Sequence, residues 1–160
     1  MLNFKNFLKY LFVILFSILI DQISKSFLII YLKTKYGMTI ELTPWLDIVY
    51  AWNYGISFGL FSQYFQYSNY VFVIINCLIV SYLVTILKSS SNRIQSFGLS
   101  FIIGGAIGNL IDRLARGAVF DFIYLHNEKY SFPAFNFADS FINIGVFFVI
   151  LSMIKSRKIK

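Results

Sequence analysis

The feature that most constrains this chain is a series of four apolar runs, each about as long as a membrane-spanning helix. They cover about residues 8–32, 70–87, 94–114 and 137–154. A helix needs roughly 20 mostly apolar residues to cross the hydrocarbon core of a bilayer. Only 13% of the residues are charged, whereas soluble domains carry roughly 25%. The sequence therefore predicts an all-α membrane protein with four transmembrane helices, forming a single domain over residues 1–160.

Charge divides the sequence into two sides. Loops on the cytoplasmic side of membrane proteins carry an excess of Lys and Arg. Basic residues without acidic neighbours flank one end of the apolar runs: Lys5, Lys9, Lys88, Arg93, Lys155, Arg157, Lys158 and Lys160. Both termini are therefore expected in the cytoplasm, with residues 33–69 and 115–136 as the outer regions. Membrane topology accounts in this way for the net charge of +7, so no nucleic-acid partner is expected.

The first outer region, residues 33–69, is too polar to cross a bilayer. Large apolar side chains alternate with other residues in 40–42 and again in 48–52. This pattern predicts two short strands, which would form a small outer β-platform. Residues 60–67 are rich in aromatic side chains and carry no charge, which favours a short helix lying in the membrane interface.

The second outer region, residues 115–136, is expected to be a loop with breaks at Gly117 and Pro133. His126 is the only histidine, and it is expected to be solvated at an exposed tip. The only cysteine, Cys77, lies in the second apolar run and is expected to be a buried, inert thiol. One cysteine excludes an internal disulfide and a cysteine-cluster metal site. The sequence therefore predicts no metal and no cofactor.

Three of the seven acidic residues, Asp112, Asp121 and Asp139, lie against hydrophobic sequence. Ionisable groups beside membrane-length apolar runs are costly, so each is a candidate functional residue. Asp121 and Asp139 are 18 residues apart around a loop that can double back, so their carboxyl groups can meet. Two adjacent carboxyl groups do not both ionise easily, and one keeps a proton while the other acts as a base. Such a pair can activate water against an amide carbonyl and protonate the leaving amine.

Asp21 and Lys25 are four residues apart on the first predicted helix, so they can pair on one helix face. Two interpretations stay open for this pair. It can be a structural ion pair that makes a polar helix end tolerable, or it can contact a ligand directly.

Several amides and one guanidinium map to the same outer depth as the acids. Asn53, Asn109 and Asn136 can hold substrate carbonyl or backbone groups through their side-chain amides. Arg113 can hold a carbonyl or lipid ester oxygen, or it can pair with Asp112. Equally, all of these side chains can satisfy helix-end and loop backbone groups, so both readings stay open.

Two further classes of protein compete with a protease. Paired carboxyl groups inside a membrane also serve as proton relays in transporters, although a transporter would place them near the bilayer centre. A non-enzymatic assembly factor would use the polar segments for structure alone.

Four polar boxes in a fixed order carry a resemblance over the full length of the chain. They are Asp21–Lys25, Asn53–Gly59, Gly108–Arg113 followed by Gly117–Phe122, and Phe135–Ser140. In this order, within a chain of four spans, they resemble the lipoprotein signal peptidases, the type II signal peptidases of bacterial membranes. Phe120 departs from the small aliphatic residue that is usual before the aspartate, which is expected to alter local packing only.

The resemblance implies an aspartic endopeptidase of the bacterial inner membrane. Such enzymes remove signal peptides from diacylglyceryl-modified prolipoproteins by cutting before the lipidated cysteine. The catalytic pair would be Asp121 and Asp139, near the outer face. The implied substrate-binding residues are Asn53, Gly55, Asn109, Arg113 and Asn136, and the supporting residues are Asp21, Lys25 and Asp112.

The resemblance also implies partners and moving parts. Membrane lipid and globomycin-type inhibitors are expected to bind, and the protein is expected to be a monomer. The stretch after Asn53 is expected to form an interfacial flap over the site.

Overall fold

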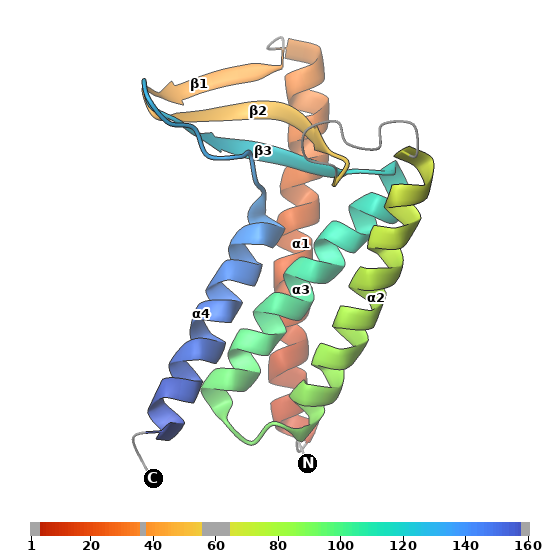
Figure 1. Ribbon diagram of the computed structural model, residues 1–160, viewed down its shortest axis with the longest axis vertical. Helices are drawn as coiled ribbons and strands as arrows, with labels where there is room; N and C mark the ends of the chain where they lie inside the picture. Colours follow the sequence, from red (N-terminus) through yellow and green to blue (C-terminus); the bar gives the residue numbers. More distant parts are fainter. Residues whose placement is uncertain (1–3, 36–37, 56–64, 158–160) are drawn as a thin grey trace.

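The computed structural model describes residues 4–35, 38–55 and 65–157. The helices and strands of the described chain are, in order, α1 (Phe4–Lys35), β1 (Thr39–Thr43), β2 (Leu46–Asn53), α2 (Phe65–Ser89), α3 (Arg93–Arg116), β3 (Val119–Leu125) and α4 (Phe137–Arg157). The helices form a bundle with the sheet at one end (Figure 1). The start of α1 and the end of α4 both lie at the other end (Figure 1).

Within the described residues, four helices are long and apolar enough to cross a membrane, as the sequence predicted. They are Phe7–Thr34, Asn69–Ser89, Arg93–Arg116 and Phe137–Ser156. The third is the most enclosed: 50% of its most apolar 18-residue stretch is buried, against 6% for the second helix. Helix α3 is therefore the centre of the bundle, while α2 presents most of its surface outward.

Close packing of α3 against α4 depends on glycine. A Cβ added to Gly98 would lie 2.6 Å from the carbonyl oxygen of Gly145, and one added to Gly145 would lie 2.5 Å from that of Gly98. Only residues without side chains allow two helix backbones to come this near. The two glycines thus set the separation of the helices that carry most of the candidate site.

The sheet has three antiparallel strands in the order β1-β2-β3. Strands β1 and β2 confirm the two predicted strands of the outer platform. The prediction that residues 115–136 form a loop was wrong in part, because Val119–Leu125 is strand β3. Its partner is β2, with Trp52 opposite Phe120 and Ala51 opposite Asp121. A pairing across some 70 residues leaves no mark in the local sequence, so the strand was missed.

The sheet packs against the helices through an aromatic core. Phe120 and Phe122 are buried together with Leu32 near the end of α1. The ring centroid of Phe120 lies 5.2 Å from those of Tyr50 and Trp52. The large side chain at position 120 thus packs against two aromatic neighbours on β2.

Two smaller expectations from the sequence were wrong. Cys77 is exposed on α2, because this helix is covered so little by the others. His126 is not simply solvated, since its Nε2 lies 3.0 Å from the Asp47 carboxylate and its ring stacks on Tyr124. The expected flap and most of the expected interfacial helix, residues 56–64, lie outside the described residues.

Candidate active site

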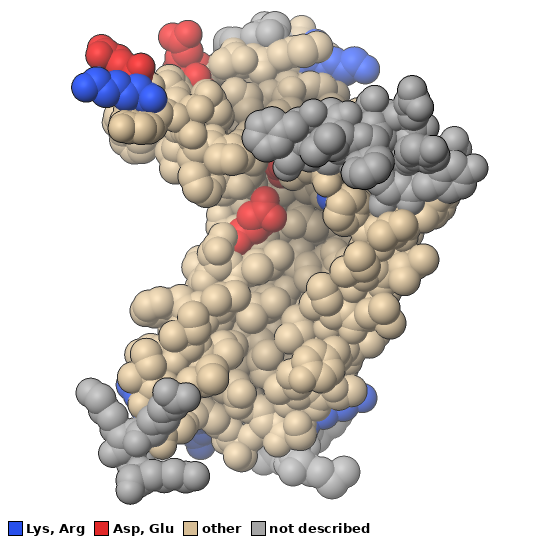
Figure 2. Space-filling view, in the orientation of Figure 1, with Lys and Arg blue, Asp and Glu red and all other residues tan. Residues whose placement is uncertain are grey.

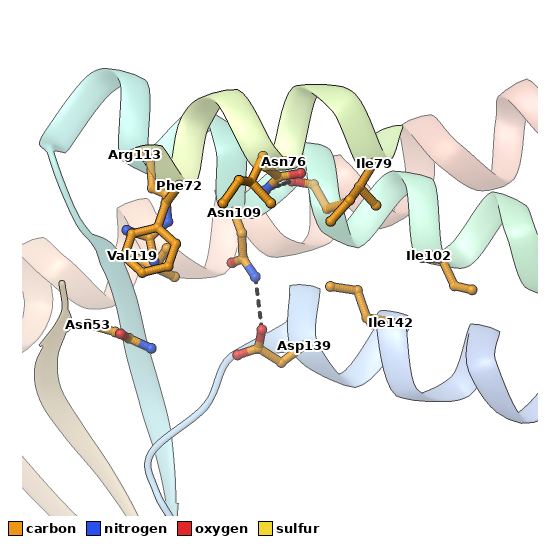
Figure 3. A pocket seen from close by; sticks show the side chains of 12 residues that line it. Asn53, Phe72, Asn76, Ile79, Ile102, Asn109, Arg113, Val119, Asp139 and Ile142 are labelled. Atoms are coloured by element: carbon orange, nitrogen blue, oxygen red, sulfur yellow. Dashed lines mark hydrogen bonds between the residues drawn. The ribbon is translucent and has the colours of Figure 1, made fainter. Parts of the chain in front are cut away.

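A pocket of about 400 Å³ opens where the sheet meets the helices. Helices α3 and α4 contribute Asn109, Arg113 and Asp139 to it, and Asn53 reaches it from the end of β2 (Figure 3). Its remaining wall is largely apolar and includes Phe72, Ile75, Ile79, Ile102 and Ile142. The pocket therefore combines a polar end beneath the sheet with an apolar end between the helices.

Local structure explains how Asp121 reaches this place. Gly117 ends α3 in the left-handed region, with φ of 78°, and its N–H donates to the carbonyl of Arg113 at 3.2 Å. Glycine adopts this conformation without the steric penalty of a Cβ. The turn directs the chain into β3, where pairing with Ala51 fixes the position of Asp121.

Asn136 connects Asp121 to Asp139. Its Nδ2 donates to Asp121 Oδ1 at 2.6 Å, and its backbone N–H donates to Asp139 Oδ2 at 3.2 Å. In return the N–H of Asp139 donates to Asn136 Oδ1 at 2.9 Å. This reciprocal pattern resembles a capping box at the start of α4, which satisfies free N–H groups of the first turn. The capping residue Asn136 therefore forms hydrogen bonds with both Asp121 and Asp139.

Asn109 orients Asp139 from the opposite helix. Its Nδ2 donates to Asp139 Oδ1 at 2.8 Å (Figure 3). Its Oδ1 accepts from Lys25 Nζ at 3.0 Å and from Asn136 Nδ2 at 3.2 Å. With its amide oriented by two donors, Asn109 can present only N–H to the Asp139 carboxylate.

Lys25 lies in a buried ionic cluster behind the pocket. Its Nζ is 2.8 Å from Asp21 Oδ2 and 2.9 Å from Asp112 Oδ2, and all three side chains are fully buried. Asp21 Oδ1 also accepts the N–H of Ala138 at 2.9 Å, and Asp112 Oδ2 accepts that of Phe120 at 3.2 Å. The cluster thus ties α1 to the starts of α4 and β3, which favours the structural reading of the Asp21–Lys25 pair.

Comparison with known proteins decides the family. One family profile, described as "Signal peptidase (SPase) II", matches residues 13–155. The chain belongs to the signal peptidase II family. The resemblance seen in the four boxes is thereby confirmed, and a membrane peptidase is favoured over a transporter or an assembly factor.

Named relatives and solved structures agree with this membership. The chain is 53% identical over 148 residues to the "Lipoprotein signal peptidase" of Rickettsia akari, covering 92% of this chain and 75% of the relative. It is 50% identical over 147 residues to that of Rickettsia felis, with the same coverage. A solved structure titled as a bacterial membrane enzyme superposes with a TM-score of 0.79 at 32% identity, covering 95% of this chain and 91% of the other. The peptidase therefore shares its whole fold with that enzyme.

In this peptidase, Asp121 titrates far from its ordinary range. Burial raises the pKa of its carboxyl group, and the charge of Asp139 raises it further, to about 6. Hydrogen bonds from Asn53 and Asn136 and the charge of Lys25 lower that pKa in part. Around pH 6 Asp121 can therefore gain and lose a proton readily, as general acid–base chemistry requires.

The peptidase does not place every predicted residue on the pocket wall. Asp121 is 3% exposed and Asn136 is fully buried, so both lie just behind the lining residues. Gly55 adopts φ of 81°, and a Cβ there would overlap the ring of Phe72. Its N–H donates to Asn53 Oδ1 at 2.8 Å, so Gly55 lies against two residues of the pocket wall, Asn53 and Phe72.

Arg113 does not pair with Asp112, which was one of the two predicted roles. Arg116 occupies that position, in contact with Asp112 Oδ1. Arg113 instead lies 4.7 Å above the Phe72 ring centroid, and its buried Nη1 has no hydrogen-bond partner among the described residues. A buried guanidinium N–H left free at a pocket is available to an acceptor on a ligand.

Sequence reasoning missed two members of the ionic cluster. Gln22 Nε2 donates to Gly108 O at 3.0 Å and to Asp112 Oδ1 at 3.2 Å. Arg116 pairs with Asp112 one helical turn away. The i, i+4 spacing of Asp112 and Arg116 would have indicated the second of these, whereas Gln22 left no comparable signal.

Proposed function

We propose that this chain is an aspartic endopeptidase that removes signal peptides from diacylglyceryl-modified prolipoproteins. It cuts before the lipidated cysteine, at the outer face of a bacterial inner membrane, and works as a monomer without a metal. The proposal rests mainly on one observation: Asn136 joins Asp121 and Asp139 by hydrogen bonds at the edge of a pocket between membrane-spanning helices.

The different surroundings of the two acids support distinct roles. Asp139 accepts hydrogen bonds from the Asn109 side chain and from the Asn136 backbone, and it lines the pocket, where water and substrate can reach it. Asp121 has its pKa raised to about 6 by burial and by Asp139. When the pair holds a single proton, we assign that proton to Asp121, and we assign Asp139 as the base that takes a proton from water.

Peptide hydrolysis then needs no covalent intermediate. Water attacks the scissile carbonyl while Asp139 accepts a water proton, and Asp121 donates its proton toward the carbonyl oxygen. Collapse of the tetrahedral intermediate breaks the C–N bond, and the leaving amine takes up the proton held by Asp139. As the carbonyl re-forms, a hydroxyl of the intermediate returns a proton to Asp121, which restores the starting pair. The free Nη1 of Arg113 supplies a donor for a substrate carbonyl.

The shape of the pocket supports a lipidated substrate. Its apolar end lies between α2, α3 and α4, with Ile75, Ile79 and Ile102 on its wall. A diacylglyceryl group can leave its chains among these residues and the surrounding lipid, while the scissile bond reaches the acids beneath the sheet. Lipid-like peptide inhibitors of the globomycin type would occupy the same two-part pocket.

The test compares Asp121→Asn and Asp139→Asn with Asp47→Asn, a carboxyl group on the platform outside the pocket. Release of signal peptide from a diacylglyceryl-modified precursor is measured, with an unlipidated precursor in parallel. The variants of the catalytic dyad, Asp121 and Asp139, are each expected to lose activity by about 10²–10⁴-fold. Asp47→Asn should stay active, and the unlipidated precursor should stay intact.

Near-normal cleavage by either dyad variant would remove that residue from the mechanism. Loss of wild-type activity with a chelator would indicate a metal-dependent reaction instead. Cleavage of the unlipidated precursor at the same rate would contradict the proposed substrate class while leaving the dyad in place.

A further inference from the structure

A second cavity lies between α3 and α4, at the end of the bundle away from the sheet. Its volume is about 520 Å³, within the range of roughly 300–1,000 Å³ that is usual for ligand pockets. The wall is formed chiefly by Phe97, Phe101, Phe148 and Leu151. Two cations, Arg93 in the first turn of α3 and Lys155 near the end of α4, complete the lining.

Helix packing builds this cavity into the bundle. The helices touch at Gly98 and Gly145, and the aromatic side chains of Phe97, Phe101 and Phe148 line the cavity near this contact. The rings of Phe101 and Phe148 stack with centroids 6.4 Å apart, and Phe97 meets Tyr10 of α1 edge to face at 5.5 Å. The walls are thus held by neighbouring side chains, and the cavity is formed without a ligand.

The two cations at this cavity form no ion pair with an acidic side chain of the described residues. Arg93 and Lys155 are both exposed, and the ion pairs of the described residues involve other cations. On the face drawn in Figure 2, acidic side chains lie only toward the sheet end, while basic ones also occur at the opposite end. The exposed Lys88 at the end of α2 adds a further positive charge there.

We propose that this cavity binds an anionic phospholipid of the inner leaflet. The phosphate would lie between Arg93 and Lys155, and an acyl chain would run along Phe97, Phe101, Phe148 and Leu151. Basic pockets between membrane helices on the cytoplasmic side bind lipid headgroups in this way. The combination of an apolar wall with paired cations at one end matches an amphipathic anion.

Charge argues against other occupants. A second copy of the chain would bring the same two cations, and the chain's own ends are basic, with Lys5, Lys9, Lys158 and Lys160. A zwitterionic lipid would bring its own cation beside Arg93 and Lys155. An anionic headgroup brings negative charge to the two cations without a cation of its own.

The test titrates detergent-purified protein with phosphatidylglycerol or with phosphatidylcholine of identical acyl chains, and counts bound lipid by native mass spectrometry. A Lys or Arg near an anionic headgroup strengthens binding about fivefold, so R93Q/K155Q is expected to weaken phosphatidylglycerol binding roughly 25-fold. Binding of phosphatidylcholine should be weak in both proteins. Lys88→Gln, which removes a cation at the same end outside the cavity, should leave phosphatidylglycerol binding within about twofold of wild type.

A second variant tests the apolar part with both cations in place. Leu151→Trp fills the cavity and is expected to remove tight phosphatidylglycerol binding, with folding checked by helical circular dichroism. The proposal is overturned if the two lipids bind equally, if R93Q/K155Q binds like wild type, or if Lys88→Gln weakens binding as much as the double variant. Unchanged binding by a folded Leu151→Trp would also overturn it.

Discussion

At the residue scale, the two acids of the site differ in what surrounds them. Asp139 accepts hydrogen bonds from Asn109 and from the backbone of Asn136. Asp121 is 3% exposed, and its pKa is raised to about 6 by burial first and by the Asp139 charge second. The same desolvation that prepares Asp121 to hold a proton also destabilises the native state once that proton is lost.

The first residue-scale prediction follows from this linkage. The ordinary pKa of Asp121 is 3.8 and its native value is about 6, so the unfolded chain ionises first as pH rises. Native stability contributed by this group is therefore full below about pH 4 and lost as pH passes about 6, a change of up to about 3 kcal/mol. Asp121→Asn should raise the free energy of unfolding above pH 6 and leave it unchanged near pH 4. Unfolding in detergent micelles across this range measures the difference.

The control for this measurement is Cys77→Ala, which alters no carboxyl group and should follow the wild-type profile. An Asp121→Asn protein whose stability tracks the wild type at every pH would show that Asp121 ionises normally in the native state.

The second residue-scale prediction concerns the ionic cluster. Lys25→Met leaves Asp21 and Asp112 buried without their shared cation. Removing one partner of a buried ion pair typically destabilises a protein by about 3–5 kcal/mol, and the unfolding midpoint should fall accordingly. Lys33→Met, at an exposed lysine of the same helix, should change stability by less than about 0.5 kcal/mol. Equal effects of the two substitutions on the unfolding midpoint would show that the buried ionic cluster does not stabilise the fold.

At the element scale, α3 is the helix on which the site depends. It carries Asn109 and Arg113 toward the pocket, Asp112 toward α1, and glycines toward α4. Gly117 then turns the chain into β3, so the end of one helix decides where Asp121 lies. Small displacements of α3 against α4 would separate Asn109 from Asp139.

The element-scale prediction tests that dependence. A Cβ at position 98 would lie 2.6 Å from the Gly145 carbonyl oxygen, so Gly98→Val must push α3 away from α4. Overpacking of this kind costs about 1–3 kcal/mol, and peptidase activity should fall together with the unfolding midpoint. Ala115→Val adds comparable bulk to an exposed position of α3 and should be nearly neutral. A Gly98→Val protein with wild-type stability would contradict the close helix crossing.

At the scale of the whole molecule, the bundle has two chemically different ends. The sheet lies at one end (Figure 1), and the acidic side chains on the face drawn in Figure 2 lie toward that end. The pocket, lined by Asn53 of β2 and Asp139 at the start of α4, lies there too. The start of α1, the α2–α3 turn and the end of α4 share the other (Figure 1), where basic residues predominate. This separation suits an enzyme that receives substrate at one leaflet and is oriented by positive charge at the other.

The whole-molecule prediction fixes this orientation in the membrane. In a Cys77→Ala background, Tyr130→Cys on the platform and Ser91→Cys in the α2–α3 turn each provide one thiol at an exposed position. A membrane-impermeant maleimide added to spheroplasts should label Tyr130→Cys at once and Ser91→Cys only after permeabilisation. The opposite order of labelling would reverse the proposed topology.

The sequence by itself determined the four spans and the polar residues of the site. Runs of apolar residues and their flanking charges are local properties, and a bilayer responds to them directly. Asp121 and Asp139 could also be singled out, because a carboxyl group beside a membrane span is costly enough to need a reason.

Only the tertiary structure decided how these groups meet. Strand β3 depends on its pairing with β2, some 70 residues earlier in the chain. The bridge through Asn136 forms only where β3 meets the start of α4, and Cys77 is exposed because the other helices cover little of α2. Such pairings arise when separate faces are buried together, and the sequence around each residue carries little trace of its distant partner.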